Sequence, residues 1–436
     1  MQHRFFPHTP DDIKQMLDAI GVGSLEELYA EVPEELKLKS EPDIPHAMSE
    51  LEVRRELKRL AADVKPLVCF AGAGAYDHYQ PSIIPYIAAR SEFSTSYTPY
   101  QAEISQGTLQ YIFEYQSMMA ELTGMDISNA SMYDGATATA EAMMMCVHSA
   151  RKKNAIVISG TFAEEVLRVV RTYAHYHGVD LVEVAPREGL TDSAAIAERL
   201  KVGDVAGVMV AQPNRFGIVE DFEGLAEVCH ASGALLVINS MAAALGVLKS
   251  PGEWGADIAC GDAQSLGFPL QFGGPYCGYL CTKKELVRKM PGRLVGATLD
   301  ADGKRCFVLT MQAREQHIRR EKATSNICTA QGVMCLYVAM YLSLMGSEGL
   351  RECGEQSYAK AHYLCDALTA TGKAAKVYDA PFFCEFLLQM ADRDGFYDRA
   401  ISEGLLPGVK VGSDKLLVAV TEKRTKEEMD RLVEIL

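Results

Sequence analysis

The pattern of hydrophobic and polar residues changes along the chain. Residues 1 to about 65 are mostly polar; residues 48–64 predict a helix, a second helix is predicted after Ser24, and proline-rich joints separate them. This part is predicted to be an arm that lies on a partner subunit. After turn-rich stretches, residues 105–122 predict a helix that ends at Gly124.

From Ser131 onward, short apolar runs alternate with helical patterns. Helices are predicted near residues 163–176, 193–200 and 222–231, and strands at residues 156–159, 181–184, 205–211, 235–240, 258–260 and 278–281. Apolar strands separated by helices are typical of a mostly parallel sheet with helices on both faces. The middle of the chain is therefore predicted to be an α/β domain.

The last third of the chain has a different pattern. Helices are predicted at about residues 309–321, 330–345 and 347–370, followed by strands at 382–388 and 416–421 and by helices at 394–403 and 425–435. The predicted domains are an N-terminal helical arm with an extended segment (1–90), a large α/β domain (91–330), and a helical connection with a small C-terminal α+β domain (331–436).

Composition narrows the range of functions. The net charge is −15, which disfavours a nucleic-acid partner. The most apolar stretch, residues 333–345, is too short to span a bilayer of about 30 Å. The twelve cysteines have no zinc-site spacing, and the N-terminus has no apolar signal segment, so we expect no metal site and a cytoplasmic location.

One small-residue turn could bind a phosphate group. In Asp134-Gly135-Ala136-Thr137 a predicted helix begins, and the backbone N–H groups of a helix N-terminus attract anions. The alternative is that Asp134 caps the helix and the small residues allow tight packing. Sequence alone leaves both interpretations open.

Two positions lack groups that a pyridoxal phosphate (PLP) enzyme of this architecture needs. Between Lys249 and Lys283 the chain has no lysine, and Gln264 and Ser265 occupy the segment where such an enzyme carries its Schiff-base lysine. Asn239 ends a predicted strand where a carboxylate would pair with the pyridine nitrogen. An ordinary turn-forming asparagine would fit equally well.

Two polar segments are further candidates. Tyr97-Thr-Pro-Tyr100-Gln101 would place phenol groups on a rigid turn, either for a substrate or neighbouring subunit or for local packing. Arg314 and His317 belong to a segment of alternating charges, which is either a solvated helix face or a cationic wall for a carboxylate or an acidic partner.

Taken together, these segments resemble the glycine cleavage system P-protein family, and more narrowly the first (alpha) subunit of the two-subunit bacterial glycine decarboxylase. The resemblance runs from about residue 5 to the C-terminus. It rests on Ala71-Gly-Ala-Gly-Ala-Tyr-Asp-His-Tyr, Arg90-Ser-Glu-Phe, Tyr97-Thr-Pro-Tyr-Gln, Asn129-Ala-Ser-Met-Tyr-Asp-Gly-Ala-Thr, Gly255-Ala-Asp-Ile and Arg314-Glu-Gln-His-Ile-Arg-Arg-Glu-Lys-Ala-Thr-Ser-Asn-Ile-Cys-Thr.

The resemblance implies a PLP-dependent aminotransferase-like fold (fold type I). It also implies that a similar second subunit carries PLP on a lysine, in a segment like Asp-x-x-x-x-Asn-x-His-Lys. On residues 257–265 of this chain the family's His falls on Gln264 and its Lys on Ser265, and the family's ring-nitrogen Asp falls on Asn239. Residues 135–137 would then be a vestigial phosphate cradle, and this chain would be the subunit that binds no PLP covalently.

The family reaction follows as a further implication. Glycine condenses with PLP on the partner subunit and loses its carboxylate as carbon dioxide, and the aminomethyl group passes to the lipoyl arm of the H-protein, whose disulfide is reduced. This chain would be an obligate subunit, inactive alone, in an oxidoreductase complex. Tyr97, Tyr100 and Gln101 would complete the cleft, with Arg314 and His317 as further candidates.

Two other functions stay open at this point. The chain could be a catalytically inert structural or regulatory partner of a PLP enzyme. It could also be a self-sufficient PLP enzyme, such as an aminotransferase or desulfurase, whose lysine is Lys249 or Lys283.

Overall fold

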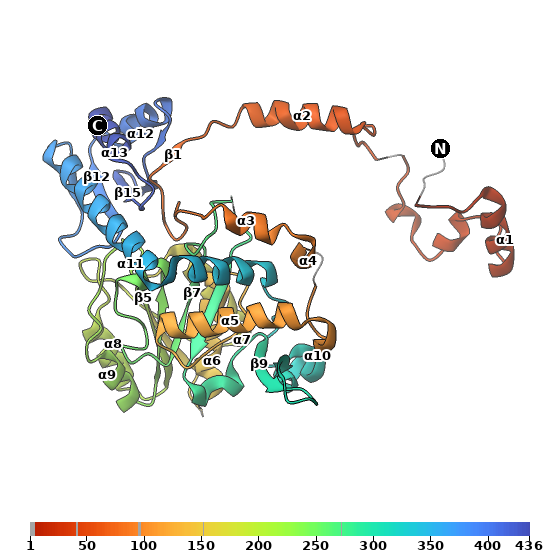
Figure 1. Cartoon of the computed structure of the whole chain (residues 1–436), viewed down its shortest axis with the longest axis horizontal. Helices are drawn as coiled ribbons and strands as arrows, with labels where there is room; N and C mark the ends of the chain where they lie inside the picture. The colour runs from red at the N-terminus through yellow and green to blue at the C-terminus, as the bar shows by residue number, and fades with distance from the viewer. Residues whose placement is uncertain (1–4, 41, 95–96, 151, 272) are drawn as a thin grey trace. The chain divides into compact units, whose positions relative to one another are not determined.

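The structure is a computed structural model that describes residues 5–40, 42–94, 97–150, 152–271 and 273–436. The contacts divide the chain into two compact units, Met1–Lys65 and Pro66–Leu436 (Figure 1). Each unit is described separately below. The predicted domain boundaries at residues 90 and 330 stay predictions.

The N-terminal unit consists of short helices joined by turns. It contains α1 (Pro10–Ile20), η1 (Glu26–Tyr29), η2 (Glu34–Leu36) and α2 (Glu50–Ala62). Thr9 and Ser49 each start a helix with a capping box, so the local sequence encodes α1 and α2. The predicted helix at 48–64 is confirmed, whereas the helix expected after Ser24 is a single 3₁₀ turn. None of the described residues of this unit is buried.

A seven-stranded sheet forms the centre of the second unit. Its strand order is β2-β8-β7-β6-β5-β3-β4, and β3 to β7 run parallel while β8 is antiparallel to both of its neighbours. The bounds are β2 (Ile127–Ser128), β3 (Ala155–Ser159), β4 (Asp180–Val184), β5 (Val205–Gln212), β6 (Leu235–Ser240), β7 (Ile258–Asp262) and β8 (Gly278–Thr282). The predicted mostly parallel sheet is confirmed.

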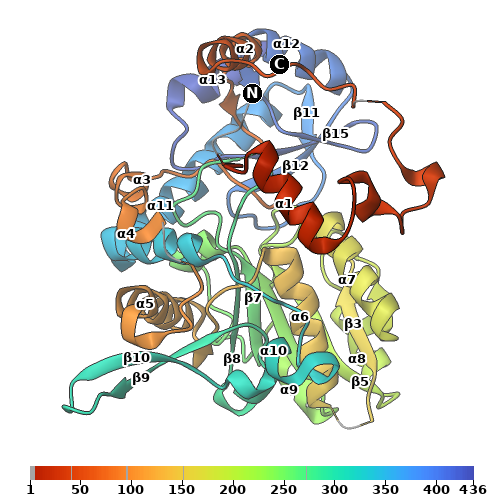
Figure 2. The same cartoon turned by 90° about the vertical axis from the view of Figure 1, so that its right-hand side faces the viewer.

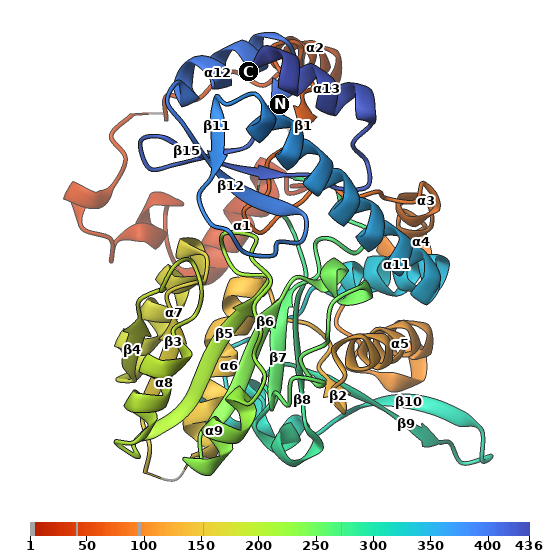
Figure 3. The same ribbon diagram turned by 90° about the vertical axis from the view of Figure 1, so that its left-hand side faces the viewer.

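Helices cover both faces of this sheet, as Figure 3 shows. On one face, α6 (Gly135–Ser149) and α7 (Glu164–His177) pack on Ile156 and Ile158. On the other face, α8 (Ser193–Leu200) and α9 (Leu225–Ala231) pack on Ala155 and Val157. Successive residues of one strand thus enter opposite cores, which is why the buried strands are continuously apolar rather than alternating.

An antiparallel ribbon projects beside α5 (Gln106–Thr123) and replaces part of a predicted helix. It comprises β9 (Leu294–Leu299) and β10 (Arg305–Thr310), and Figure 2 shows its length. The Gln116 side chain bonds both backbone groups of Val295, at 3.0 and 2.9 Å, and thereby fixes the ribbon on α5. The helix predicted at 309–321 is wrong: only η6 (Gln312–Arg314), α10 (Gln316–Arg319) and η7 (Arg320–Lys322) form, because Met311 and Arg320 have positive φ angles of 55° and 52°.

The C-terminal part contains a small sheet and a long helix. α11 (Gly332–Ala370) breaks at Gly346, so the two predicted helices on either side of it are confirmed. The small sheet has the order β11-β12-β15-β14, all antiparallel, and β1 pairs in parallel with β13 beside it. Its elements are β1 (Val68–Cys69), β11 (Ala374–Lys376), β12 (Glu385–Met390), α12 (Arg393–Ser402), β13 (Leu405–Leu406), β14 (Val409–Val411), β15 (Lys415–Ala419) and α13 (Lys426–Ile435).

By length and composition alone, α11 is one helix of the described residues that could cross a membrane. Its break at Gly346 leaves fourteen residues, Gly332–Met345, before the kink, and about twenty are needed for a span. Leu336, Val338 and Tyr341 lie in the core that α11 shares with α5. The helix is therefore a packed element of this fold. The remaining short helices are α3 (Ile83–Ala88), α4 (Ser91–Ser94), η3 (Ala102–Ile104), η4 (Ala242–Gly246) and η5 (Lys284–Lys289).

Candidate functional site

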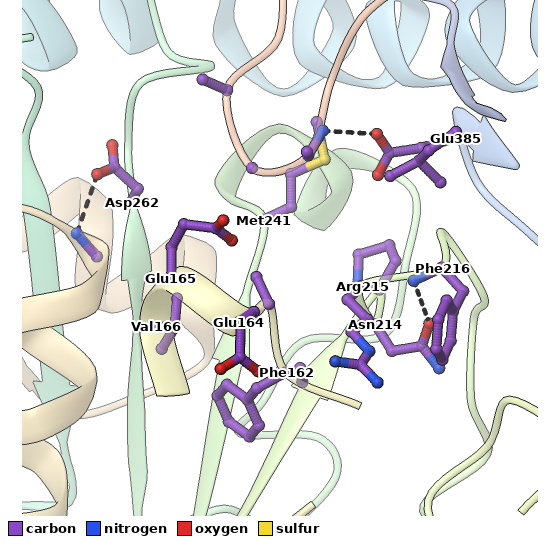
Figure 4. A pocket seen from close by; sticks show the side chains of 18 of the residues that line it. Phe162, Glu164, Glu165, Val166, Asn214, Arg215, Phe216, Met241, Asp262 and Glu385 are labelled. Atoms are coloured by element: carbon purple, nitrogen blue, oxygen red, sulfur yellow. Dashed lines mark hydrogen bonds between the residues drawn. The ribbon is translucent and has the colours of Figure 1, made fainter. Parts of the chain in front are cut away.

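A cavity of about 700 Å³ lies at the carboxyl ends of the central parallel strands (Figure 4). Asn239, Asp262, Gln264 and Ser265 line it from β6 and from the end of β7, and residues 213–216 line it from the segment after β5. The N-terminus of α6 contributes Gly135 and Ala136, and the small sheet closes another side with residues including Glu385. Open α/β sheets bind ligands at this edge, so the cavity is the candidate site.

The first turn of α6 is already occupied by carboxylates. The Gly135 N–H donates to Asp262 Oδ2 at 2.9 Å, and the Thr137 N–H donates to Asp134 Oδ1 at 2.7 Å. Burial raises the pKa of Asp262 to about 6. The positive end of the helix therefore faces two acidic side chains of the chain itself, which would repel a phosphate dianion.

Asn239 is held by a hydroxyl behind the cavity wall. Its Nδ2 donates to Thr139 Oγ1 at 2.8 Å, and the Thr139 hydroxyl donates to the carbonyl oxygen of Gly135 at 2.7 Å. The side chain is neutral and supplies no negative charge at this strand end. A protonated pyridine nitrogen placed here would have no counter-ion from Asn239.

Gln264 and Ser265 have structural roles at the positions where the family resemblance placed His and Lys. The Tyr76 N–H donates to Gln264 Oε1 at 2.8 Å, and Gln264 Nε2 donates to the carbonyl oxygens of Tyr76 and Phe268 at 2.9 and 3.1 Å. Ser265 Oγ accepts from the Ala243 N–H at 3.1 Å. Both side chains are buried, and their hydrogen bonds hold the loop at Tyr76 and the turn after β6.

None of the candidate lysines offers an amine to the cavity. Lys410 is the one lysine among the described lining residues, and its Nζ pairs with Asp394 at 2.7 Å. Lys249 lies 3.8 Å from the centre of the Trp254 ring, and Lys283 pairs with Asp257 at 2.7 Å; neither lines the cavity. The residues present do not fit PLP, because position 265 has no amine, position 239 has no carboxylate and two acidic side chains occupy the first turn of α6.

Sequence reasoning missed several residues of the cavity wall, among them Asp262, Glu385 and Arg215. Glu385 accepts from the Tyr76 hydroxyl at 3.0 Å and from the Ala73 N–H at 2.6 Å, and burial raises its pKa to about 7. The available signal was a charged residue inside the apolar strand predicted at 382–388. Arg215 also lines the cavity, and its Nε is buried without a hydrogen-bond partner among the described residues.

The aromatic and cationic candidates form a second group that does not line the cavity. Tyr100, 54% exposed, accepts from Arg293 Nη2 at 3.1 Å, and its ring centre lies 6.1 Å from that of His317. Tyr97 is 86% exposed, and Gln101 is exposed just before η3.

Arg314 bonds the backbone just before β9. It is buried, and it donates to the carbonyl oxygens of Met290 and Gly292, the latter at 2.7 Å. The solvated-helix interpretation is thus wrong for Arg314, because the chain turns at Met311 and directs the guanidinium inward.

Comparison with known proteins gives full-length matches. The family model described as glycine cleavage system P-protein matches residues 3–436. The probable glycine dehydrogenase (decarboxylating) subunit 1 of Carboxydothermus hydrogenoformans is 46% identical over 442 residues, covering 99% of each chain. The protein of the same name from Moorella thermoacetica is 47% identical over 436 residues, covering 98% of each chain.

Solved structures agree with these matches. A glycine decarboxylase (P-protein) of the glycine cleavage system, in inhibitor-bound form, superposes with a TM-score of 0.90 at 42% identity, covering 100% of this chain and 99% of that one. Alanine–glyoxylate aminotransferase from Nostoc superposes with a TM-score of 0.62 at 15% identity, covering 92% of this chain and 98% of that one. The second match shows the fold alone and confirms the predicted aminotransferase-like class.

Proposed function

The chain belongs to the glycine cleavage system P-protein family, and from that membership we propose that it is subunit 1 of a glycine dehydrogenase (decarboxylating). Such a subunit is part of an oxidoreductase that acts in glycine decarboxylation. The proposal rests mainly on the match to relatives of this name over nearly their whole length.

A "subunit 1" requires at least a second subunit, and we propose that this partner holds the PLP of the complex. The cavity of the present chain supports that division, because it has no amine at Ser265, no charge at Asn239 and an acidic side chain, Asp262, on the first turn of α6. PLP supplies an electron sink for decarboxylation wherever it is bound. The other proposed partners are glycine and the lipoylated H-protein, in the cytoplasm.

The proposed contribution of this chain to the reaction is the exposed loop that carries Tyr97, Tyr100 and Gln101. Tyr97 and Tyr100 present aromatic rings to solvent, and Arg293 holds the Tyr100 hydroxyl in place. An aromatic pair on a fixed turn suits the wall of a cleft completed by another subunit, where it would exclude water from the reacting carbon. Arg314 and His317 would support this wall from behind.

Co-expression with the second subunit tests the proposal. The chain purified alone should contain no PLP and should show no glycine-dependent exchange of carbon dioxide, whereas the purified complex should show both. Stoichiometric PLP and exchange activity in the chain alone would contradict the assignment. Borohydride reduction and peptide mapping would then identify the lysine.

A double variant separates a cleft contributor from an inert scaffold. Tyr97→Phe with Tyr100→Phe should lower turnover of the complex about tenfold or more, because a hydrogen bond to a charged group contributes about 1.5–3 kcal/mol. Tyr86→Phe is the matched control, since Tyr86 is also exposed, at 68%, and lies on α3 outside this group. Unchanged turnover in the double variant would favour the structural or regulatory partner instead.

A further inference from the structure

Arg215 is a cation of the cavity wall that has no counter-ion among the described residues. Arg215 forms no ion pair or side-chain hydrogen bond with the described residues; its guanidinium carbon lies 4.8 Å from the centre of the Phe216 ring. The other lining cation, Lys410, pairs with Asp394 at 2.7 Å, and Arg393 contacts the same carboxylate oxygen at 2.9 Å. A half-buried guanidinium with a buried, unpaired Nε is a ready partner for a carboxylate.

The other side of the cavity has the opposite character. Asp262 and Asp134 face it from the end of β7 and from the start of α6, and Figure 4 shows Asp262 and Arg215 flanking the cavity with Glu165 between them in this view. Each Asp262 oxygen accepts one backbone N–H, from Gly135 at 2.9 Å or from Gln264 at 2.8 Å, and keeps room for a further donor. Such carboxylates select an ammonium group.

We propose that this cavity binds a small α-amino acid in its zwitterionic form, with the ligand's carboxylate on Arg215 and its ammonium group on Asp262 and Asp134. The cavity matches this class because it offers a cation and carboxylates at separate positions, and position 265 carries no amine. Inorganic phosphate and other dianions are disfavoured, since the two lining cations, Arg215 and Lys410, stand beside several lining carboxylates.

Glycine is the probe of choice, and this choice rests on the proposed function. A non-covalent glycine site on subunit 1 would respond to the substrate of the complex without consuming it. It would therefore act as a sensing site for that substrate.

Ligand titration of the purified full-length chain tests the inference. Calorimetry or ¹³C-glycine NMR should show saturable glycine binding that is about tenfold tighter or more than binding of acetate, methylamine or inorganic phosphate. Arg215→Gln should weaken glycine and acetate about tenfold or more while leaving methylamine unchanged, and Arg215→Lys should recover part of the glycine affinity.

Two further variants keep the test independent of misfolding. Asp262→Asn should weaken glycine and methylamine but not acetate; circular dichroism checks its fold, because Asp262 also caps α6. Arg351→Gln removes an exposed arginine that pairs with Glu355 on α11 at 2.6 Å, and it should bind glycine like the unaltered chain.

Several outcomes would overturn the inference: glycine binding no tighter than acetate, equal glycine affinity in Arg215→Gln and Arg351→Gln, or phosphate binding tighter than glycine. The exchange assay on the complex is a separate measurement. An active complex whose subunit 1 binds no glycine refutes this inference alone. A glycine-binding chain whose complex is inactive refutes the proposed function alone.

Discussion

Replacing Ser265 with lysine should place an amine at the Schiff-base position but should give only weak PLP binding. The reason is the first turn of α6, where Asp262 and Asp134 already accept the N–H groups of Gly135 and Thr137. The electrostatic repulsion between one negative charge of a phosphate and an ionised carboxylate about 4 Å away is about 4 kcal/mol, at an effective dielectric constant of about 20.

Protonation of Asp262 is the less costly way to admit the phosphate. Burial raises the pKa of Asp262 to about 6, so holding it neutral at about pH 8 costs about 3 kcal/mol, or about a hundredfold in affinity. The uncharged Asn239 lowers the affinity for PLP further, because it cannot stabilise the protonated pyridine nitrogen of the cofactor. Ser265→Lys alone should therefore bind PLP only weakly.

Borohydride reduction followed by mass spectrometry measures the outcome. The Ser265→Lys variant should retain less than one PLP per chain. Adding Asp262→Asn to it should raise the affinity for PLP about a hundredfold, and adding Asn239→Asp as well should raise that affinity again. Ser265→Met is the matched control, since it fills the same space without an amine. Stoichiometric PLP on Ser265→Lys alone would show that the acidic turn does not exclude the phosphate.

Three further predictions concern the walls of the cavity. Gln264→Leu should lower the free energy of unfolding by about 2–4 kcal/mol in urea denaturation, because it removes three hydrogen bonds and leaves the Tyr76 backbone groups buried without partners; a loss below about 1 kcal/mol would contradict this role. The folded-state pKa of Glu385 is raised from 4.5 to about 7, so its contribution to stability is present below about pH 4.5 and is lost as the pH rises to about 7. Across that range the unaltered chain should lose about 3 kcal/mol that Glu385→Gln keeps, and parallel stability curves would refute the prediction. Gly217→Ala should lower the free energy of unfolding by more than about 3 kcal/mol, since a Cβ there would lie 1.8 Å from the Glu385 carbonyl oxygen at a φ of 81°. The control Gly203→Ala, which has a φ of 84° and open space around it, should lower it by about 1 kcal/mol. Equal melting temperatures of the two variants would disprove the prediction.

The small-sheet wall of the cavity illustrates what local sequence could not reveal. Strand β12 was expected from its apolar residues, whereas the charged Glu385 within it was given no role. Its partners, Tyr76 and Ala73, come from a loop more than three hundred residues earlier in the chain. No periodic pattern encodes such a contact, because it depends on how the small sheet packs beside the large one.

The ribbon of β9 and β10 is a second case. Residues 309–321 carry helix-forming side chains and were expected to form a helix, whereas α5 imposes an extended conformation on β9 and on the start of this segment. Gln106 and Gln116 of α5 bond the backbone of β10 and β9, so tertiary contacts override the local preference.

The sequence alone determined the parallel sheet, the helices on its two faces and the missing amine at Ser265. These follow from residue periodicity and residue identity, which are local properties. Only the tertiary structure decided that Asp262 reaches the first turn of α6, that Gln264 holds the loop at Tyr76 and that Arg215 has no ion-pair partner among the residues that the structure describes. Each of these depends on where distant strand ends and loops meet, and that is fixed by packing of the whole core rather than by any single segment.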